Sequence, residues 1–463
     1  MGRLFGTDGI RGIANTELSC ELALRLGRAA AKAMPGLHPA ENGRRARILI
    51  GMDTRASSAM LASALAAGFN SAGVDVICAG VTPTPAAAHL ISRWHCGGGA
   101  MVSASHNPCE YNGIKLFQAN GFKLPDALEE QIEALLLDET ELPPGLTGGQ
   151  VGRAQAREEE ALAVYLHHLC ATVPSDLAAG LRAQGIIRRV ALDCANGAAS
   201  MTAQKLFFDL LGFEGDMISF SPDGENINAG CGSTHVERLR DFVRSGGYDA
   251  GFAFDGDADR VLAVDETGAL VDGDKIIAVC AKQMQREGKL RRGSAVVTVM
   301  SNLGFHAFCR KNGIACEVTG VGDRYVLERM NEKGFNLGGE QSGHIIFSDH
   351  ASTGDGQLTA LQLLDTVRKA GKPLSTLANE MELFPQVLVN VRVSSLGKLR
   401  CASDADVRAA VTRAEAELGE EGRVLVRVSG TEPLVRVMLE GKDAARIQVL
   451  AEEIAGVISE RLL

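Results

Sequence analysis

The sequence predicts an α/β protein in which three similar α/β units precede a smaller α+β unit. Strand-like apolar runs alternate with helical stretches in three successive blocks, a pattern typical of sheets covered by helices. The residues after 376 follow a different order, with two strands meeting at a turn between helices. The chain has 463 residues, 46% hydrophobic and 22% charged. At roughly 100 to 200 residues per domain, this length favours three domains and allows two to four.

Charge and cysteine content narrow the class of protein. Lysine and arginine number 47 and aspartate and glutamate 57, which gives a net charge of −10 and argues against general binding to nucleic acid or anionic membranes. The eleven cysteines are an odd number without a C-x-x-C pair, so we expect reduced, buried thiols. No apolar run reaches the roughly 18 residues of a membrane span. We therefore expect a cytoplasmic protein.

The first block contains four predicted strands and two helices. Residues 57–70 place Met60, Leu61, Ala64, Leu65 and Phe69 on one helical face. A second helix, 125–137, starts with a proline in its first turn. The predicted strands are 47–52, 74–77, 100–102 and 113–117. Residues 143–152, rich in proline and glycine, predict a boundary.

The same alternation then repeats twice. In the second block the predicted strands are 188–193, 215–220 and 249–254, and the predicted helices are 198–211 and 235–245. In the third block the strands are 295–299 and 315–318, and the helices are 303–311 and 325–333. The final unit is predicted as strand 386–393, helix 404–418, strands 423–428 and 434–440, and helix 443–462.

The segment Asp255-Gly256-Asp257-Ala258-Asp259-Arg260 lies between two apolar runs and is the strongest functional signal. Carboxylates at alternate positions of an extended segment project to one side, where they repel unless a cation lies between them. A divalent metal, preferably Mg²⁺, fits this pattern. An EF-hand calcium loop does not, because Arg260 occupies the position that needs glycine. The alternative is a solvated acidic turn.

A serine-rich loop follows the predicted strand 100–102. Its sequence is Ser103-Ala104-Ser105-His106-Asn107-Pro108, and a hydroxyl on such a loop suits a nucleophile. The alternative is an ordinary turn before a proline. Lys115 is near enough in sequence to serve the same loop.

Two glycine-containing turns complete the set of candidates. Gly338-Gly339-Glu340-Gln341-Ser342-Gly343-His344 offers a carboxylate, a hydroxyl and an imidazole to a polyhydroxylated ligand. Arg427-Val428-Ser429-Gly430-Thr431-Glu432-Pro433, with Arg436 beyond it, offers guanidiniums, hydroxyls and backbone amides, the parts of a phosphate cradle. Each could also be a simple hairpin turn. Neither a Walker-type nor a dinucleotide-binding glycine motif is present.

Taken together, the four segments resemble the α-D-phosphohexomutase family over nearly the whole chain. The opening Phe5-Gly6-Thr7-Asp8-Gly9-Ile10-Arg11-Gly12 and the final Ser429-Gly430-Thr431-Glu432-Pro433 are similar to the branch that acts on hexosamine phosphates. Two positions depart from the pattern or vary within it. Ala258 stands where the metal loop more often has glycine, and Gln341 lies at a variable position.

The resemblance implies mixed sheets and four domains around a central cleft, with the last domain acting as a lid. The expected domains are 1–152 with the serine loop, 153–267 with the metal loop, 268–376 with the sugar loop and 377–463 with the phosphate loop. It also implies an isomerase that interconverts glucosamine 6-phosphate and glucosamine 1-phosphate through a phosphoserine and a 1,6-bisphosphate intermediate, in UDP-N-acetylglucosamine and cell-wall precursor synthesis.

The resemblance also assigns roles to individual residues. Ser105 carries the phosphoryl group, and Mg²⁺, one per active site, is held by Asp255, Asp257, Asp259 and the Ser105 phosphate. Arg11 and Lys115 steady that group, and Lys115 or His106 moves the proton. Arg260 braces the metal loop. The expected substrate-binding residues are Arg260, Glu340, Ser342, His344, Arg427, Ser429, Gly430, Thr431 and Arg436.

The expected activator is glucosamine 1,6-bisphosphate or glucose 1,6-bisphosphate, and the expected partners are small hexosamine phosphates and a second copy in a homodimer. Neither nucleic acid nor a membrane is expected. The alternatives are a phosphomannomutase/phosphoglucomutase activity, a metal-dependent sugar-phosphate phosphatase and a non-catalytic sugar-phosphate sensor.

Overall fold

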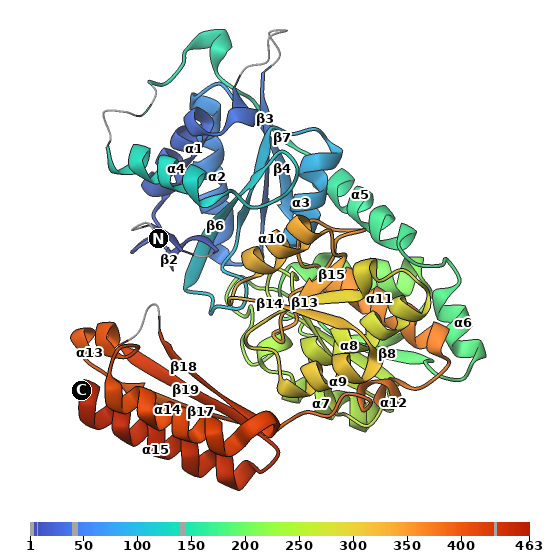
Figure 1. Cartoon of the computed structure of the whole chain (residues 1–463). Helices are drawn as coiled ribbons and strands as arrows, with labels where there is room; N and C mark the ends of the chain where they lie inside the picture. Colours follow the sequence, from blue (N-terminus) through green and yellow to red (C-terminus); the bar gives the residue numbers. More distant parts are fainter. Residues whose placement is uncertain (1–3, 7, 39–44, 139–141, 143, 430–432) are drawn as a thin grey trace. The chain divides into compact units, whose positions relative to one another are not determined.

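The computed structural model describes residues 4–6, 8–38, 45–138, 142, 144–429 and 433–463 (Figure 1). The chain forms two compact units. Unit 1 comprises Met1–Met300 and Ile314–Asn379, and unit 2 comprises Ser301–Gly313 and Glu380–Leu463. Unit 1 contains three sheets and unit 2 contains one.

The first sheet of unit 1 is mixed, with strand order β1-β2-β6-β5-β3-β4-β7. Its parallel strands are joined through helices, and β6 pairs antiparallel with both β2 and β5. The strands are β1 (Phe5–Gly6), β2 (Gly9–Ile13), β3 (Arg47–Met52), β4 (Asp75–Val81), β5 (Gly98–Val102), β6 (Tyr111–Gln118) and β7 (Ala154–Ala156).

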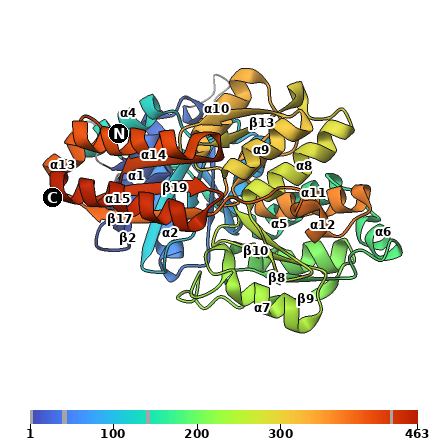
Figure 2. The same ribbon diagram turned by 60° about the horizontal axis from the view of Figure 1, so that its bottom comes forward.

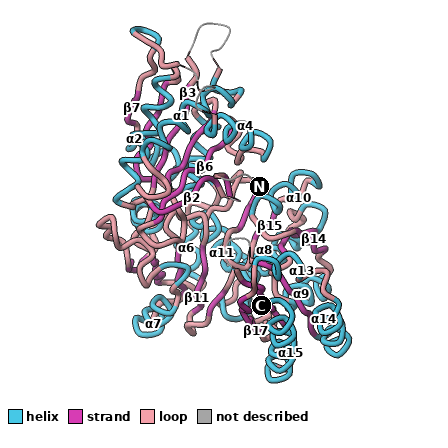
Figure 3. Tube along the Cα trace, turned by 90° about the vertical axis from the view of Figure 1, so that its left-hand side faces the viewer, coloured by secondary structure: helices cyan, strands magenta, loops and turns pink. Residues whose placement is uncertain are grey.

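Helices cover both faces of this sheet (Figure 1), and one of the two helical layers faces the viewer in Figure 3. Successive residues of β3 point to opposite faces, so Ile48 and Ile50 pack under one helical layer and Leu49 under the other. One layer consists of α1 (Cys20–Ala33), α2 (Ala56–Ser71) and α4 (Asp126–Leu137), and the other of α3 (Thr84–Arg93) and α5 (Glu158–Ala171). The carboxyl end of β5 is thereby held between two packed layers, and the serine loop follows it.

The second sheet has the order β12-β11-β10-β8-β9, with β10 antiparallel to β11 and parallel to β8. Its strands are β8 (Arg189–Asp193), β9 (Glu214–Ile218), β10 (Ala250–Phe254), β11 (Val261–Asp265) and β12 (Leu270–Val271). The accompanying helices are α6 (Leu177–Ala183), a 3₁₀ turn (Ala198–Met201), a π-helix (Gln204–Leu210) and α7 (Glu237–Gly246).

The third sheet is also mixed, with the order β14-β13-β15-β16. Its strands are β13 (Ser294–Thr298), β14 (Ala315–Thr319), β15 (Leu337–Gly339) and β16 (Ile345–Phe347), and its helices are α8 (Gly273–Arg286), α10 (Asp323–Lys333), α11 (Gly356–Ala370) and α12 (Leu374–Ala378).

Unit 2 contains an antiparallel sheet of order β17-β19-β18. Figure 2 shows α14 and α15 lying beside each other over these strands. The strands are β17 (Gln386–Arg392), β18 (Gly422–Val428) and β19 (Leu434–Gly441), and the helices are α9 (Leu303–Asn312), α13 (Ser395–Arg400), α14 (Ala405–Leu418) and α15 (Ala444–Leu462).

The predicted fold class of three α/β sheet units and a smaller α+β unit is confirmed. Several predicted boundaries were shifted: Pro125 caps α4 instead of lying in its first turn, and 198–211 splits into a 3₁₀ and a π-helical part. Six of the eleven free cysteines are buried and five are partly buried. Within the described residues, no helix has the length and apolar content needed to span a membrane.

Candidate active site

The hydroxyl of Ser105 and the acidic loop meet inside unit 1. Ser105 lies three residues after β5, and the acidic loop 255–260 joins β10 to β11, whose residues Phe254 and Val261 are paired. Ser105 Oγ donates a hydrogen bond of 2.6 Å to Asp255 Oδ2. The structure therefore brings together two candidates that are 150 positions apart in sequence.

The three aspartates of the loop form a compact carboxylate cluster. One oxygen each from Asp255, Asp257 and Asp259 lies within 4.8 Å of the others, and all three residues are buried. Ala258 adopts a left-handed backbone conformation with φ of 57°. Gly256 lies so close to Ser105 that a Cβ there would sit 2.6 Å from the Ser105 carbonyl oxygen. This close approach requires glycine.

The electrostatics of this cluster favour a bound cation. Burial, together with the nearby charges of Asp259 and Asp257, raises the pKa of Asp255 well above its ordinary value. Asp257 Oδ1 and Asp259 Oδ1 are buried and have no hydrogen-bond partner among the described residues. Buried carboxylate oxygens without partners are costly unless they coordinate a cation, and oxygen ligands suit Mg²⁺. The residues present therefore fit a divalent metal.

Lys115, on β6, supplies a positive charge to the same cluster. Its Nζ lies 2.9 Å from Asp257 Oδ2, 3.1 Å from Asp8 Oδ2 and 3.7 Å from Asp259 Oδ2. Burial acts to lower the pKa of this ammonium, but the carboxylates of Asp257, Asp8 and Asp259 raise it above its ordinary value. Lys115 is therefore charged at neutral pH.

A chain of ion pairs extends this charged cluster toward the third sheet. Arg11, on β2, contacts Asp8, and Lys123 Nζ lies 2.5 Å from Asp8 Oδ1 and 2.6 Å from Asp323 Oδ2. Asp8, Lys123 and Asp323 were not among the residues expected to form the site. Asp323 begins α10, and nothing in its local sequence links it to a residue of the first sheet.

Two further candidates lie next to the cluster. Burial, followed by the charges of Arg260 and Arg11, lowers the pKa of His106 to about 4, so its imidazole is neutral at neutral pH. The backbone N–H of Arg260 donates to Asp255 Oδ1 at 3.2 Å, and its Nε lies 3.9 Å from Asp259 Oδ1. Arg260 thus contacts both the first and the third aspartate of the loop.

The turn between β15 and β16 holds Glu340, Ser342 and His344. Glu340 Oε1 accepts a 3.2 Å hydrogen bond from the backbone N–H of Gly322, whereas Ser342 is exposed. His344 is buried, and its Nε2 lies 3.5 Å from Asp323 Oδ2 and 4.0 Å from Asp259 Oδ2. His344 therefore connects this turn to the carboxylate cluster.

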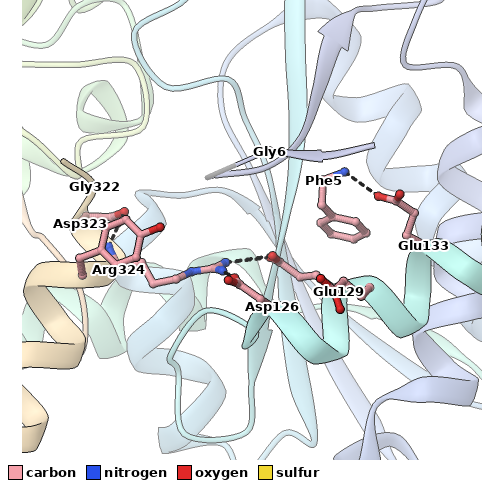
Figure 4. A pocket seen from close by; sticks show the side chains of 10 residues that line it. Phe5, Gly6, Asp126, Glu129, Glu133, Gly322, Asp323 and Arg324 are labelled. Carbon is pink, nitrogen blue, oxygen red and sulfur yellow. Dashed lines mark hydrogen bonds and ion pairs between the residues drawn. The ribbon is translucent and has the colours of Figure 1, made fainter. Parts of the chain in front are cut away.

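A cavity of about 360 Å³ lies beside the Gly322–Asp323 segment (Figure 4). Arg324 points toward Asp126 and Glu129 of α4, and its Nη2 lies 3.0 Å from both carboxylate oxygens of Glu129. Glu133 accepts hydrogen bonds from the backbone N–H groups of Leu4 and Phe5. Most acidic groups of this cavity are thus already paired.

In unit 2, Arg427 on β18 and Arg436 on β19 occupy directly opposite positions of the antiparallel pair. Directly opposite residues of an antiparallel pair point to the same face of the sheet, so these two guanidiniums lie on one face, where their N–H donors suit an anion. Ser429 follows β18 and is buried, and its N–H donates to the carbonyl of Leu434 at 2.8 Å. The candidates Gly430 and Thr431 lie outside the described residues.

Four family models match successive parts of the chain. They are described as Phosphoglucomutase/phosphomannomutase, alpha/beta/alpha domains I, II and III and C-terminal domain, and they match residues 2–143, 163–268, 272–384 and 388–457 respectively.

A relative of the same length is 50% identical over 462 residues. It is the phosphoglucosamine mutase of Acetivibrio thermocellus, and the match covers 100% of both chains. Solved structures with the same fold include a phosphoglucomutase/phosphomannomutase family protein of Burkholderia thailandensis, with a TM-score of 0.79, 23% identity and coverage of 99% of this chain and 98% of that one. Another is Aspergillus fumigatus N-acetylphosphoglucosamine mutase in complex with GlcNAc-6P and magnesium, with a TM-score of 0.65, 18% identity and coverage of 99% and 95%.

Proposed function

Since this chain belongs to the phosphoglucosamine mutases of the phosphoglucomutase/phosphomannomutase family, and is therefore an isomerase, we propose that it interconverts glucosamine 6-phosphate and glucosamine 1-phosphate. The observation that carries the proposal is the 2.6 Å contact between Ser105 Oγ and Asp255 within a buried triple-carboxylate cluster. A phosphoryl-accepting hydroxyl placed beside a metal-binding cluster is what phosphoryl transfer requires.

In the proposed reaction, Ser105 carries a phosphoryl group. The P–O bond to Ser105 Oγ breaks as a P–O bond forms to a sugar hydroxyl, and the hydroxyl proton is transferred to Ser105 Oγ through a protein base. The resulting 1,6-bisphosphate reverses its orientation in the site. Ser105 Oγ then takes back the other phosphoryl group, while the Ser105 proton returns to the sugar oxygen. We propose that Lys115 or His106 moves the proton, the charged Lys115 as a donor or the neutral imidazole of His106 as an acceptor.

We propose that Asp255, Asp257 and Asp259, with an oxygen of the Ser105 phosphate, hold one Mg²⁺. When bound, the metal neutralises negative charge on the phosphoryl group during transfer. Arg11 and Lys115 add positive charge, and Arg260 fixes the acidic loop through its contacts with Asp255 and Asp259.

The remaining candidates bind the rest of the substrate in this proposal. The sugar hydroxyls form hydrogen bonds with Glu340, Ser342 and His344, because this one turn offers a carboxylate, a hydroxyl and an imidazole. The phosphate that is not reacting is bound by Arg427, Ser429, Gly430, Thr431 and Arg436. The cross-strand arginine pair supports this second assignment.

The proposal extends to the protein's setting. We propose domains at 1–152, 153–267, 268–376 and 377–463, each supplying one functional loop. Glucosamine 1,6-bisphosphate or glucose 1,6-bisphosphate is the proposed activator. The protein would act in the cytoplasm as a homodimer and contribute to UDP-N-acetylglucosamine synthesis.

The test compares kcat/KM for glucosamine, glucose and mannose phosphates with Mg²⁺ and a bisphosphate activator. We expect glucosamine phosphate to be preferred and Ser105→Ala to be inactive. A preference of an order of magnitude for glucose or mannose phosphate would refute the substrate assignment. Release of inorganic phosphate at the rate of turnover would indicate a phosphatase instead.

A further inference from the structure

The backbone of Ser105 is held in an unusual conformation. Its φ is 52°, in the left-handed region, and the residue is 1% exposed. For a residue other than glycine this conformation is strained, because Cβ lies too close to the following carbonyl oxygen. Such strain persists only where surrounding contacts impose it.

A closed ring of hydrogen bonds imposes it from both sides of the residue. The N–H of Ser105 donates to Ser103 Oγ at 2.9 Å, and Ser103 Oγ donates to Asp53 Oδ2 at 2.7 Å. Arg55 Nε donates to the same Asp53 oxygen at 2.9 Å. Arg55 Nη2 then donates to the Ser105 carbonyl oxygen at 2.8 Å, which closes the ring.

The arginine of this ring also fixes the rest of the loop. Arg55 Nη2 donates to the Asn107 carbonyl at 2.9 Å, and Nη1 donates to the Pro108 carbonyl at 2.6 Å. The guanidinium is therefore bonded to three carbonyls and one carboxylate. A lysine ammonium cannot reproduce this planar arrangement of donors.

The side chain of Asn228, which follows β9 of the second sheet, also donates hydrogen bonds to this loop. Asn228 Nδ2 donates to the carbonyls of Ser105 at 2.9 Å and Asn107 at 3.1 Å, two of the three that Arg55 binds. Asp53, Arg55 and Asn228 are 1%, 2% and 7% exposed. We call Asp53, Arg55, Ser103 and Asn228 the Ser105 clasp.

We propose that Arg55 is a positioning residue for phosphoryl transfer, and that the Ser105 clasp keeps Ser105 Oγ in one place through both half-reactions. This inference rests on the proposed function. The bisphosphate presents its two phosphates in turn, so the accepting oxygen must occupy the same position each time. A displacement of about 1 Å at a reacting atom can lower the rate roughly 100-fold. All the described hydrogen bonds of the Arg55 side chain go to Asp53 and to loop carbonyls, so Arg55 acts through Ser105.

The test is Arg55→Lys, with Arg47→Lys as the matched control. Arg47 also donates to a backbone carbonyl, that of Trp94 at 3.0 Å, but on the exposed start of β3. We expect Arg55→Lys to lower kcat roughly 100-fold with KM unchanged, and hydrogen exchange to accelerate at the Ser105 amide. Arg47→Lys should change none of these. An unchanged kcat, or a loss of kcat explained wholly by a smaller folded fraction, would overturn the proposal.

A second variant keeps the test decisive if Arg55→Lys does not fold. Asn228→Gly is compatible with the left-handed backbone of Asn228, whose φ is 59°, and removes the side chain that donates the two hydrogen bonds to the loop. We expect it to lower kcat about tenfold, with KM unchanged. A tenfold loss corresponds to an increase of roughly 1.4 kcal/mol in the activation free energy. Failure of the proposed function would appear differently, as a wild-type chain without mutase activity. In that case amide exchange at Ser105 still decides whether the clasp holds the loop: faster exchange in Asn228→Gly supports it and unchanged exchange contradicts it.

Discussion

Replacement of Lys115 by methionine removes the ammonium group at the centre of the active-site carboxylates and leaves a side chain of similar length. Nζ lies 2.9 Å from Asp257, 3.1 Å from Asp8 and 3.7 Å from Asp259, and the lysine side chain is 2% exposed. Removing one partner of a buried ion pair typically costs about 3–5 kcal/mol, because the other charge is left uncompensated. We expect Lys115→Met to lower the free energy of unfolding of unit 1 by this amount at pH 7.

The assay is urea unfolding with and without Mg²⁺. A cation bound by the three aspartates replaces part of the lost positive charge, so Mg²⁺ should stabilise the variant more than the wild type. At a concentration one hundred times its dissociation constant, a ligand adds about 2.7 kcal/mol. The control is Lys289→Met, which removes a 2.8 Å pair to Glu287 from a side chain that is 65% exposed. A loss in Lys115→Met as small as in this control, which should be under about 1 kcal/mol, would refute the reasoning.

Three other predictions follow from single contacts. Burial raises the pKa of Asp355 to about 7, although hydrogen bonds from the Leu358 N–H and Tyr165 hydroxyl oppose the rise. The folded state then holds a proton that the unfolded state releases, so this group lowers stability as pH rises from about 4 to about 7, by up to roughly 1.4 kcal/mol per pH unit. Asp355→Asn should flatten this dependence in urea unfolding at several pH values, and an unchanged slope would contradict it. Ala258→Gly should change the free energy of unfolding by less than about 1 kcal/mol, because relief of left-handed strain offsets the lost methyl group and the added flexibility of the unfolded chain. Ala360→Gly, the control inside α11, should lower it by about 2 kcal/mol. Equal losses for the two variants in urea unfolding would contradict this prediction. Arg427→Gln should raise KM for the sugar phosphate by roughly 10- to 100-fold, which corresponds to the loss of one charge-assisted hydrogen bond. An unchanged KM in steady-state kinetics would exclude Arg427 from the phosphate site.

The sequence predicted the sheet units because their strands are short, apolar and bounded by turns. It did not identify α11, in which nearly all residues from Gly356 to Val367 are buried. Polar Gln357, Thr359 and Asp365 are buried there together with the apolar residues, so burial in this helix does not follow the apolar pattern of the sequence. It also missed α1, although Glu21, Arg25, Arg28 and Lys32 recur at helical spacing on the face opposite the buried alanines and indicate an amphipathic helix. The π-helical turn at Gln204–Leu210 was predicted as part of one regular helix, since the two share the same amphipathic signal.

The site was predictable where its residues are adjacent in sequence. The aspartates of the acidic loop are spaced so that their shared role is visible in a single segment. Arg55 and Asn228, by contrast, reach the Ser105 loop only through the tertiary fold, across 50 and 123 positions of sequence. Asp8, Lys123 and Asp323 likewise meet because the turn before β2, the segment after β6 and the start of α10 converge.

The most direct test of the proposed mechanism is the intact mass of the protein before and after incubation with the bisphosphate activator and Mg²⁺. The mechanism predicts that one phosphoryl group is added, that peptide mapping places it on Ser105, and that the addition fails without metal and in Ser105→Ala. A phosphoryl group on another residue, or full mutase activity in Ser105→Ala, would contradict it.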